Sequence, residues 1–152
     1  MIWNPERECM DRESLKKLQS ERLVRIVKHA YDNVPFYKKK MDDMGLKPSD
    51  IKSIDDISKL PFTVKTDLRE NYPDGLFAVD RSEIIRLHAS SGTTGKPIVA
   101  GYTAHDVENW KEGVARCLTA YGASKEDTIQ ISYGYGLFTG GLGAHDGATK
   151  IG

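Results

Sequence analysis

The sequence predicts an α/β fold, in which a mostly helical region over residues 1–80 precedes the start of a sheet over residues 81–152. Two observations divide the chain in this way. The first region carries apolar residues at helical spacing, and prolines and glycines break it into short helices and turns. The second region alternates β-branched runs of strand length with one amphipathic helix, and such alternation predicts a βαβ unit in a parallel or mixed sheet.

The first region begins with a short helix, because Asn4 and Pro5 are typical of an N-cap and a first helical position. A long helix follows from Asp11. It has to stop before Pro35, since the residue before a proline disfavours the helical conformation. A shorter helix is expected over residues 36–44.

Turn and capping residues organise the rest of this region. Gly45 is expected to end the preceding helix in the left-handed conformation. Ser53 could cap a single helical turn, and Thr63 or Thr66 could cap a short helix that runs through residues 68–72. We expect no catalytic group in the first eighty residues.

The second region contains the predicted strands. Residues 83–87 are β-branched and apolar enough to form a strand, residues 98–102 are a second strand-like run, and the two flank a glycine-rich stretch. Thr103, with an acid three residues later, has capping-box spacing and begins a helix that Gly122 ends. Residues 127–132 are expected to form another strand.

Composition excludes several classes of function. The 152 residues carry 22 Lys plus Arg and 22 Asp plus Glu, and this balance argues against nucleic acid as a partner. Cys9 and Cys117 show neither metal-ligand spacing nor a disulfide framework, so reduced thiols in a cytoplasmic protein are expected. We expect neither a signal peptide nor a membrane span, and no metal site.

The stretch from Ser90 to Pro97 has the composition of a polyphosphate site. Glycines let the backbone approach a ligand closely, hydroxyls donate hydrogen bonds, and a lysine adds a positive charge. The stretch is not a Walker A loop, because only two residues separate its glycines and Pro97 follows the lysine. A solvated hairpin turn has the same composition. The residues that would hold phosphate are Ser90, Ser91, Gly92, Thr93, Thr94, Gly95 and Lys96.

A second glycine-rich stretch, Tyr133–His145, follows the last predicted strand. Glycines beside aromatic residues suit a backbone packed against an apolar ligand. They equally suit the start of a buried helix, with Phe138 and Leu142 in the core. The stretch does not complete a dinucleotide fingerprint, because Thr139 stands where the third glycine is required.

Four segments carry a family resemblance. Ser90–Pro97 resembles, without interruption, the phosphate loop of the adenylate-forming superfamily. Leu60–Pro73, Ser132–His145 and His29–Tyr37 resemble segments of the phenylacetate–CoA ligases within that superfamily. Together they extend over most of the chain in the right order, so the chain resembles the N-terminal portion of such a ligase.

The resemblance implies the start of the sheet of the large N-terminal domain of an adenylate-forming enzyme, in a partial ATP- and acyl-binding domain. It implies an AMP-forming reaction, in which Mg²⁺ and ATP convert an aryl acid to an acyl adenylate and coenzyme A then displaces AMP. The phosphates would lie on the Ser90–Lys96 residues named above. Tyr133, Tyr135 and Phe138 would line the aryl pocket. Relatives of this kind are often homodimers, so a homo-oligomer is expected.

The chain departs from the resemblance in two ways. Members of the family are much longer and carry an adenylation lysine in a part that cannot be placed here, so no catalytic residue is assigned and a fragment with little turnover is expected. Asp146 stands where an aromatic residue is expected, and a buried acid is costly unless it is paired or solvated. Two alternatives stay open: a ligase for another aryl acid or acceptor, and a non-catalytic interaction or dimerisation module.

Overall fold

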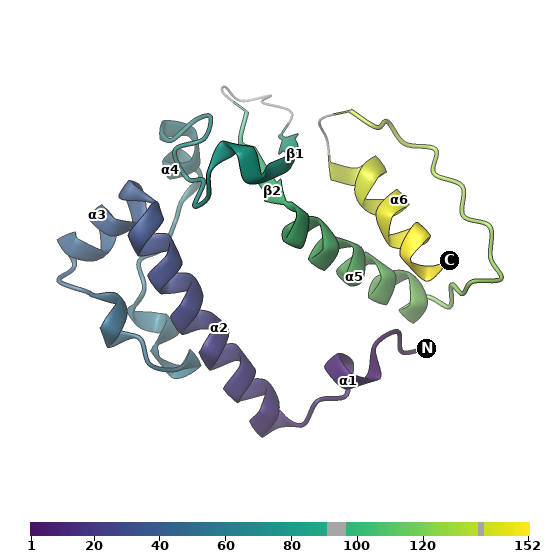
Figure 1. Ribbon diagram of the computed structural model, residues 1–152, viewed down its shortest axis with the longest axis horizontal. Coiled ribbons are helices and arrows are strands. Elements are labelled where there is room, and N and C mark those ends of the chain that lie inside the picture. Colours follow the sequence, from purple (N-terminus) through teal and green to yellow (C-terminus); the bar gives the residue numbers. More distant parts are fainter. Residues whose placement is uncertain (91–96, 137–138) are drawn as a thin grey trace. The chain divides into compact units, whose positions relative to one another are not determined.

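The computed structural model describes residues 1–90, 97–136 and 139–152 (Figure 1). It divides into two compact units. One unit is Met10–Arg81, and the other combines Met1–Cys9 with Ser82–Gly152. No helix within the described ranges is both long enough and apolar enough to cross a membrane.

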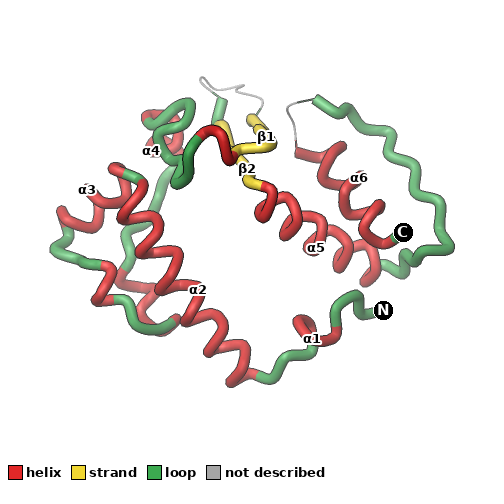
Figure 2. Tube along the Cα trace, in the orientation of Figure 1, coloured by secondary structure: helices red, strands yellow, loops and turns green. Residues whose placement is uncertain are grey.

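The Met10–Arg81 unit is helical (Figure 2). Its elements are α2 (Arg12–Asn33), α3 (Pro35–Asp43), η1 (Pro48–Asp50), η2 (Ile54–Lys59) and α4 (Lys65–Glu70). The long helix begins and ends where the sequence predicts, because the Asp11 side chain accepts the Ser14 N–H and Pro35 follows the C-cap residue Val34.

The core of this unit lies between α2 and the chain that follows it. Val27, Met41 and Ile51 are buried, and they come from α2, α3 and the residue after η1. The turn between α3 and η1 contains Gly45 at φ 66°, which confirms the predicted left-handed stop. Leu23, Tyr31, Leu46 and Leu60 pack around this core.

The predicted caps of the short helices have different outcomes. The cap of η2 is confirmed, since Ser53 forms a capping box with Asp56. The cap of α4 is wrong, because neither Thr63 nor Thr66 occupies the N-cap position, which belongs to Val64. The Asp67 carboxylate accepts the Val64 N–H at 3.0 Å from within the first turn.

The second unit contains the sheet. Its elements are α1 (Pro5–Glu8), η3 (Arg81–Glu83, which starts at the unit boundary), β1 (Ile84–Ala89), β2 (Val99–Thr103), α5 (Ala104–Ala120) and α6 (Thr139–Ile151). β1 and β2 pair antiparallel, as in the hairpin that the sequence left open and as a mixed sheet allows. Both strands are confirmed, and so is the capping box of Thr103 and Asp106 at the start of α5.

The expected strand over residues 127–132 is wrong, and with it the predicted βαβ unit. In the described structure these residues are mostly exposed and join α5 to α6 without strand geometry, as the long loop of Figure 2 shows. The reason is physical. A β-branched run becomes a strand only when it pairs with another strand, and in the described part of the chain the two-stranded sheet pairs β1 with β2 alone.

Glycines of α6 let this helix lie close against α5. A Cβ atom at Gly143 would lie 2.8 Å from Nε1 of Trp110, and one at Gly147 would lie 2.1 Å from Cγ1 of Val114. The interpretation of this stretch as a helix whose glycines permit close packing is therefore confirmed. Leu142 is half-buried, and Phe138 lies outside the described residues.

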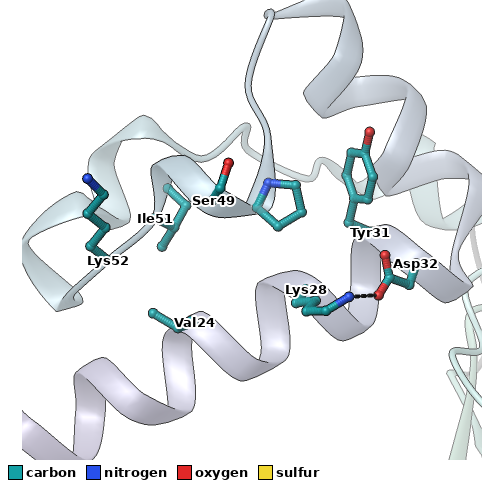
Figure 3. A pocket seen from close by; sticks show the side chains of 8 residues that line it. Val24, Lys28, Tyr31, Asp32, Ser49, Ile51 and Lys52 are labelled. Carbon is teal, nitrogen blue, oxygen red and sulfur yellow. Dashed lines mark hydrogen bonds and ion pairs between the residues drawn. The ribbon is translucent and has the colours of Figure 1, made fainter.

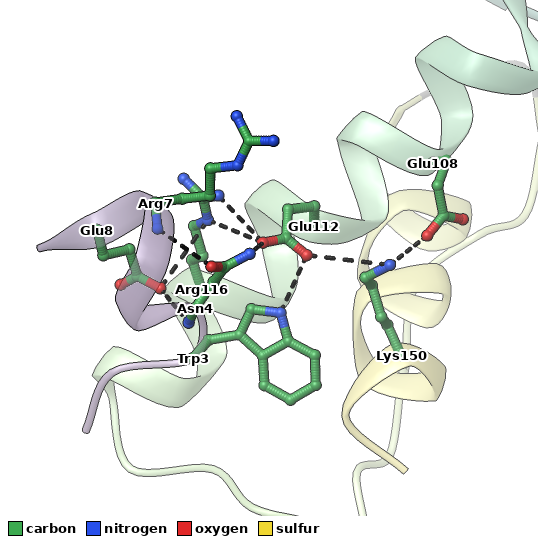
Figure 4. Close-up of polar contacts among 8 residues, drawn as sticks. All are labelled: Trp3, Asn4, Arg7, Glu8, Glu108, Glu112, Arg116 and Lys150. Carbon is green, nitrogen blue, oxygen red and sulfur yellow. Dashed lines mark hydrogen bonds and ion pairs between the residues drawn. The ribbon is translucent and has the colours of Figure 1, made fainter. Parts of the chain in front are cut away.

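The first residues of the chain attach to α5 through the Glu112 carboxylate and through an ion pair of Glu8 with Arg116 at 3.9 Å, as Figure 4 shows. Glu112 accepts hydrogen bonds from Trp3 Nε1 at 3.1 Å and from Asn4 Nδ2 at 2.8 Å. Arg116 donates to the same carboxylate at 3.0 Å, and Lys150 of α6 lies 3.9 Å away. Burial raises the pKa of Glu112, but the three hydrogen bonds outweigh it and leave the pKa lowered.

Candidate functional site

The β1–β2 hairpin holds both ends of the stretch that the sequence predicts to bind phosphate. The Ser90 N–H donates to the Ile98 carbonyl oxygen at 2.9 Å. In return, the Ile98 N–H donates to the Ser90 hydroxyl oxygen, also at 2.9 Å. Of the predicted phosphate residues, Ser91, Gly92, Thr93, Thr94, Gly95 and Lys96 lie outside the described residues.

A cluster of three rings lies beneath this closed end. His88 of β1 is only 2% exposed. Its ring centroid lies 5.5 Å from that of Tyr102 on β2 and 5.3 Å from that of Trp110 on α5, and the latter two are 4.9 Å apart. Burial, together with the negative charge of Asp106, raises the pKa of Tyr102. Because each ring contacts the other two, the cluster joins both strands to α5.

An ion pair joins the same hairpin to α6. Arg86 of β1 pairs with Asp146, and their side chains are 19% and 14% exposed. The sequence analysis expects Asp146 to be either paired or solvated, and in the structure it is paired with Arg86. Breaking such a largely buried pair is costly, because the remaining charge is left without compensation.

The two described tyrosines of the predicted aryl pocket lie beside the start of α6. Tyr133 is 61% exposed, and its ring lies over Gly140. Tyr135 is 50% exposed, and its hydroxyl lies 3.2 Å from Nδ1 of His145. These contacts place both tyrosines against α6.

A separate open pocket of about 670 Å³ lies in the Met10–Arg81 unit (Figure 3). It lies between α2 and the η1 segment, and Lys28 and Asp32 pair along its α2 side. Lys52 is the other charged residue of its lining, and the lining offers no further acid or base beside it. The lining residues are Val24, Lys28, Tyr31, Asp32, Pro48, Ser49, Ile51 and Lys52.

Sequence reasoning missed the ring cluster and the pairing of Ser90 with Ile98. The signal for the cluster was present, because His88 lies in a predicted strand and Trp110 in a predicted helix. Contact between them depends on the antiparallel hairpin, which the sequence left open as one interpretation of the Ser90–Pro97 stretch. In the described residues, no group of three or more His, Cys, Asp or Glu side chains could hold a metal ion.

The similarity of the chain to known proteins extends over nearly its whole length. No protein-family model matches the chain. The chain is 55% identical over 145 residues to the phenylacetate-coenzyme A ligase of Aromatoleum evansii, covering 95% of this chain and 33% of that protein. It is 52% identical over 152 residues to the enzyme of the same name from Thermus thermophilus, covering 100% of this chain and 34% of that protein.

Solved structures of a 2-hydroxyisobutyryl-CoA ligase share the fold. A complex with 2-HIB-AMP and CoA matches with a TM-score of 0.89 and 32% identity, covering 99% of this chain and 33% of that chain. An open conformation of the same ligase matches with a TM-score of 0.87 and 30% identity. The prediction that the fold is part of an adenylate-forming CoA ligase is therefore confirmed.

The chain spans about a third of the length of the curated relatives that it matches. Its similarity to them is nevertheless continuous, since the matches cover 92% or more of this chain at 52–55% identity. The chain is therefore a homologue of the phenylacetate–coenzyme A ligases and corresponds to about one third of such a protein.

Proposed function

We propose that the chain supplies the phosphate-binding loop and part of the acyl pocket of an AMP-forming ligase for phenylacetate. The observation that carries this proposal is the identity of 52–55% to phenylacetate-coenzyme A ligases. In the proposed reaction, a carboxylate oxygen of phenylacetate attacks the α-phosphorus of ATP and pyrophosphate leaves. The sulfur of coenzyme A then attacks the acyl carbon, and AMP leaves with the bonding electron pair.

The loop would act on the first step of the reaction by binding the negatively charged phosphates of ATP. Ser90, Ser91, Gly92, Thr93, Thr94, Gly95 and Lys96 are proposed to bind the phosphates of ATP with its Mg²⁺. Donors fixed in place before the reaction stabilise the charge on phosphate oxygens without having to reorganise. The hydrogen bonds between Ser90 and Ile98 support this role, because they fix the two ends of the loop. The Ser90 hydroxyl accepts from Ile98 and still has its own proton to donate.

Tyr133, Tyr135 and Phe138 are proposed to line the aryl pocket. Support comes from the exposed rings of Tyr133 and Tyr135, which leave apolar surface available to a ligand. The contact between the Tyr135 hydroxyl and His145 would orient one of these rings. No residue of the chain is assigned the role of the adenylation lysine. We therefore expect the isolated chain to bind nucleotide with little or no turnover, and we place the ligase in the cytoplasm as a homo-oligomer.

Thermal unfolding of the chain with and without Mg·ATP tests the loop assignment. A ligand that binds only the folded state stabilises it by about 2.7 kcal/mol at a hundredfold excess over its Kd. We expect a clear upward shift of Tm for the wild type and a much smaller one for the Thr93→Ala/Thr94→Ala double variant. Equal shifts in both proteins would remove the assignment.

A second candidate function is a ligase of the same kind that activates a different carboxylic acid. The matching solved structures belong to a 2-hydroxyisobutyryl-CoA ligase at 30–32% identity, so a small hydroxy acid is a defined competitor for the pocket. In the ligase that contains this sequence, AMP formation can be compared with phenylacetate, benzoate, 2-hydroxyisobutyrate and a fatty acid. A preference for phenylacetate supports the first candidate, and the opposite preference supports the second.

A non-catalytic interaction or dimerisation module would behave differently in the thermal unfolding experiment. Mg·ATP would not change the Tm of the chain, while self-association or a partner chain would raise it. The thermal measurement therefore also separates this alternative from the ligase.

A further inference from the structure

Strand β1 is anchored through the side chains of one face. Leu87 is 42% exposed, whereas Arg86 is largely buried and His88 is fully buried. Arg86 pairs with Asp146 of α6, and His88 packs against Trp110 of α5. Two positions on the same face therefore tie the strand to two different helices.

The second of these positions lies next to the closed end of the hairpin. His88 is opposite Ala100 in the antiparallel register, and Ser90 and Ile98 exchange their hydrogen bonds two residues further along, beyond the Ala89–Val99 pair. Neighbouring positions of an antiparallel ladder are mechanically coupled, because each strand's backbone fixes the spacing of successive bonds. A change in the distance between β1 and β2 at His88 would therefore reach Ser90 through the single intervening pair, Ala89 and Val99.

We infer that His88 is a positioning residue for the nucleotide: its ring, packed against Tyr102 and Trp110, fixes the spacing at which Ser90 and Ile98 close the hairpin. The inference rests on the proposed function, in which the loop that begins at Ser90 holds the phosphates. Without the ring, the closed hairpin end becomes one of several arrangements. The apparent Kd for a ligand then equals the intrinsic Kd divided by the fraction of molecules in the competent arrangement.

Binding of Mg·ATP to three variants tests this role, with each Kd measured well below the Tm of that variant. If only one molecule in ten keeps the closed end, His88→Ala weakens binding about tenfold. His88→Phe keeps a ring of similar size against Tyr102 and Trp110 and is expected to retain clearly more of the wild-type affinity than His88→Ala, because these ring contacts remain. Leu87→Ala, on the exposed face of the same strand, is the matched control and should bind like the wild type.

A purely structural role for His88 would lower the Tm and leave the Kd of the folded protein unchanged. That result, or a His88→Phe variant as weak as His88→Ala, overturns the inference. If His88→Ala does not fold, Tyr102→Leu removes another ring of the cluster and is expected to weaken binding in the same way. Wild-type affinity in Tyr102→Leu would count against the inference.

Amide hydrogen exchange supplies a readout that needs no ligand. We expect the amides of Ser90 and Ile98 to exchange at least about tenfold faster in His88→Ala than in the wild type, while amides of α2 stay unchanged, because local opening sets their protection. Unchanged exchange at both amides overturns the inference. If the wild type does not bind Mg·ATP, the proposed function fails, and the exchange result alone then decides whether His88 holds the hairpin end.

Discussion

Asp56 shows how one carboxylate can organise a turn of the chain. It accepts the N–H groups of Lys52 and Ser53, at 2.8 and 3.2 Å, and its other oxygen lies 2.7 Å from Nζ of Lys59. The hydrogen bond from Lys59, followed by those from the backbone, lowers the pKa of Asp56 from 3.8 to about 2. The charged form is therefore favoured in the folded chain.

The pKa shift of Asp56 has a defined consequence for stability. A carboxyl group whose pKa is lowered by folding stabilises the native state above its unfolded pKa, and this contribution is lost as the pH falls through the folded value. We expect Asp56→Asn to lower the Tm at pH 7, by a difference that narrows between pH 3.8 and about 2. Thermal unfolding monitored by circular dichroism across this range measures the difference.

Asp55 supplies a matched control for this experiment. Its side chain is 67% exposed and forms a single ion pair with Lys16. Exposed pairs contribute little to stability, so Asp55→Asn should change the Tm less than Asp56→Asn at pH 7. A Tm difference for Asp56→Asn that stays constant from pH 7 to about pH 2 would show that the charge of Asp56 is not the source of its effect.

At the scale of elements, the packing of α6 on α5 depends on residues without side chains. A Cβ atom at Gly147 would lie 2.1 Å from Cγ1 and 2.4 Å from Cβ of Val114. Gly147→Ala gains helix propensity, but it forces these helices apart, and overpacking of this kind costs about 1–3 kcal/mol. We expect a lower free energy of unfolding in a urea titration.

Gly113 of α5 is the control, because a Cβ atom there meets nothing within 4 Å. Gly113→Ala should raise the free energy of unfolding by about 0.5–1 kcal/mol, the usual gain of alanine over glycine within a helix. A Gly147→Ala variant that gains as much as Gly113→Ala would contradict the close contact between α6 and α5.

The elements that sequence reasoning located are those whose signals are local. Asp11, Ser53 and Thr103 cap helices with their own side chains, within three residues of the groups that they bind. The cap of α4 was not predictable in this way. Asp67 takes part in it while also pairing with Lys40, which lies 27 residues earlier in the chain, at 2.5 Å.

Errors in the predicted sheet have the same origin. Residues 127–132 have strand composition, but composition does not specify a partner strand, and the described structure gives them none. The candidate site also has one part that the sequence predicts and another that it does not. The Ser90–Pro97 stretch is visible in the sequence because its residues are contiguous, whereas His88, Tyr102 and Trp110 come together only through the hairpin and α5.

At the scale of the whole molecule, the chain consists of two compact units. The proposed phosphate loop, the ring cluster and the predicted aryl-pocket tyrosines all belong to the unit that contains Ser82–Gly152. The chain also covers about a third of its curated relatives. Binding of nucleotide can therefore be tested on the chain itself, independently of turnover.

A calorimetric titration of the chain with Mg·ATP, Mg·ADP and AMP tests the central claim most directly. If the Ser90–Lys96 residues hold the terminal phosphates, affinity falls in the order ATP, ADP, AMP, because each lost phosphate removes charge-assisted hydrogen bonds worth about 1.5–3 kcal/mol each. The Thr93→Ala/Thr94→Ala variant should bind ATP no better than the wild type binds AMP. Equal affinity for ATP and AMP, or no binding of ATP, would contradict the proposal that this stretch is the phosphate loop of a ligase.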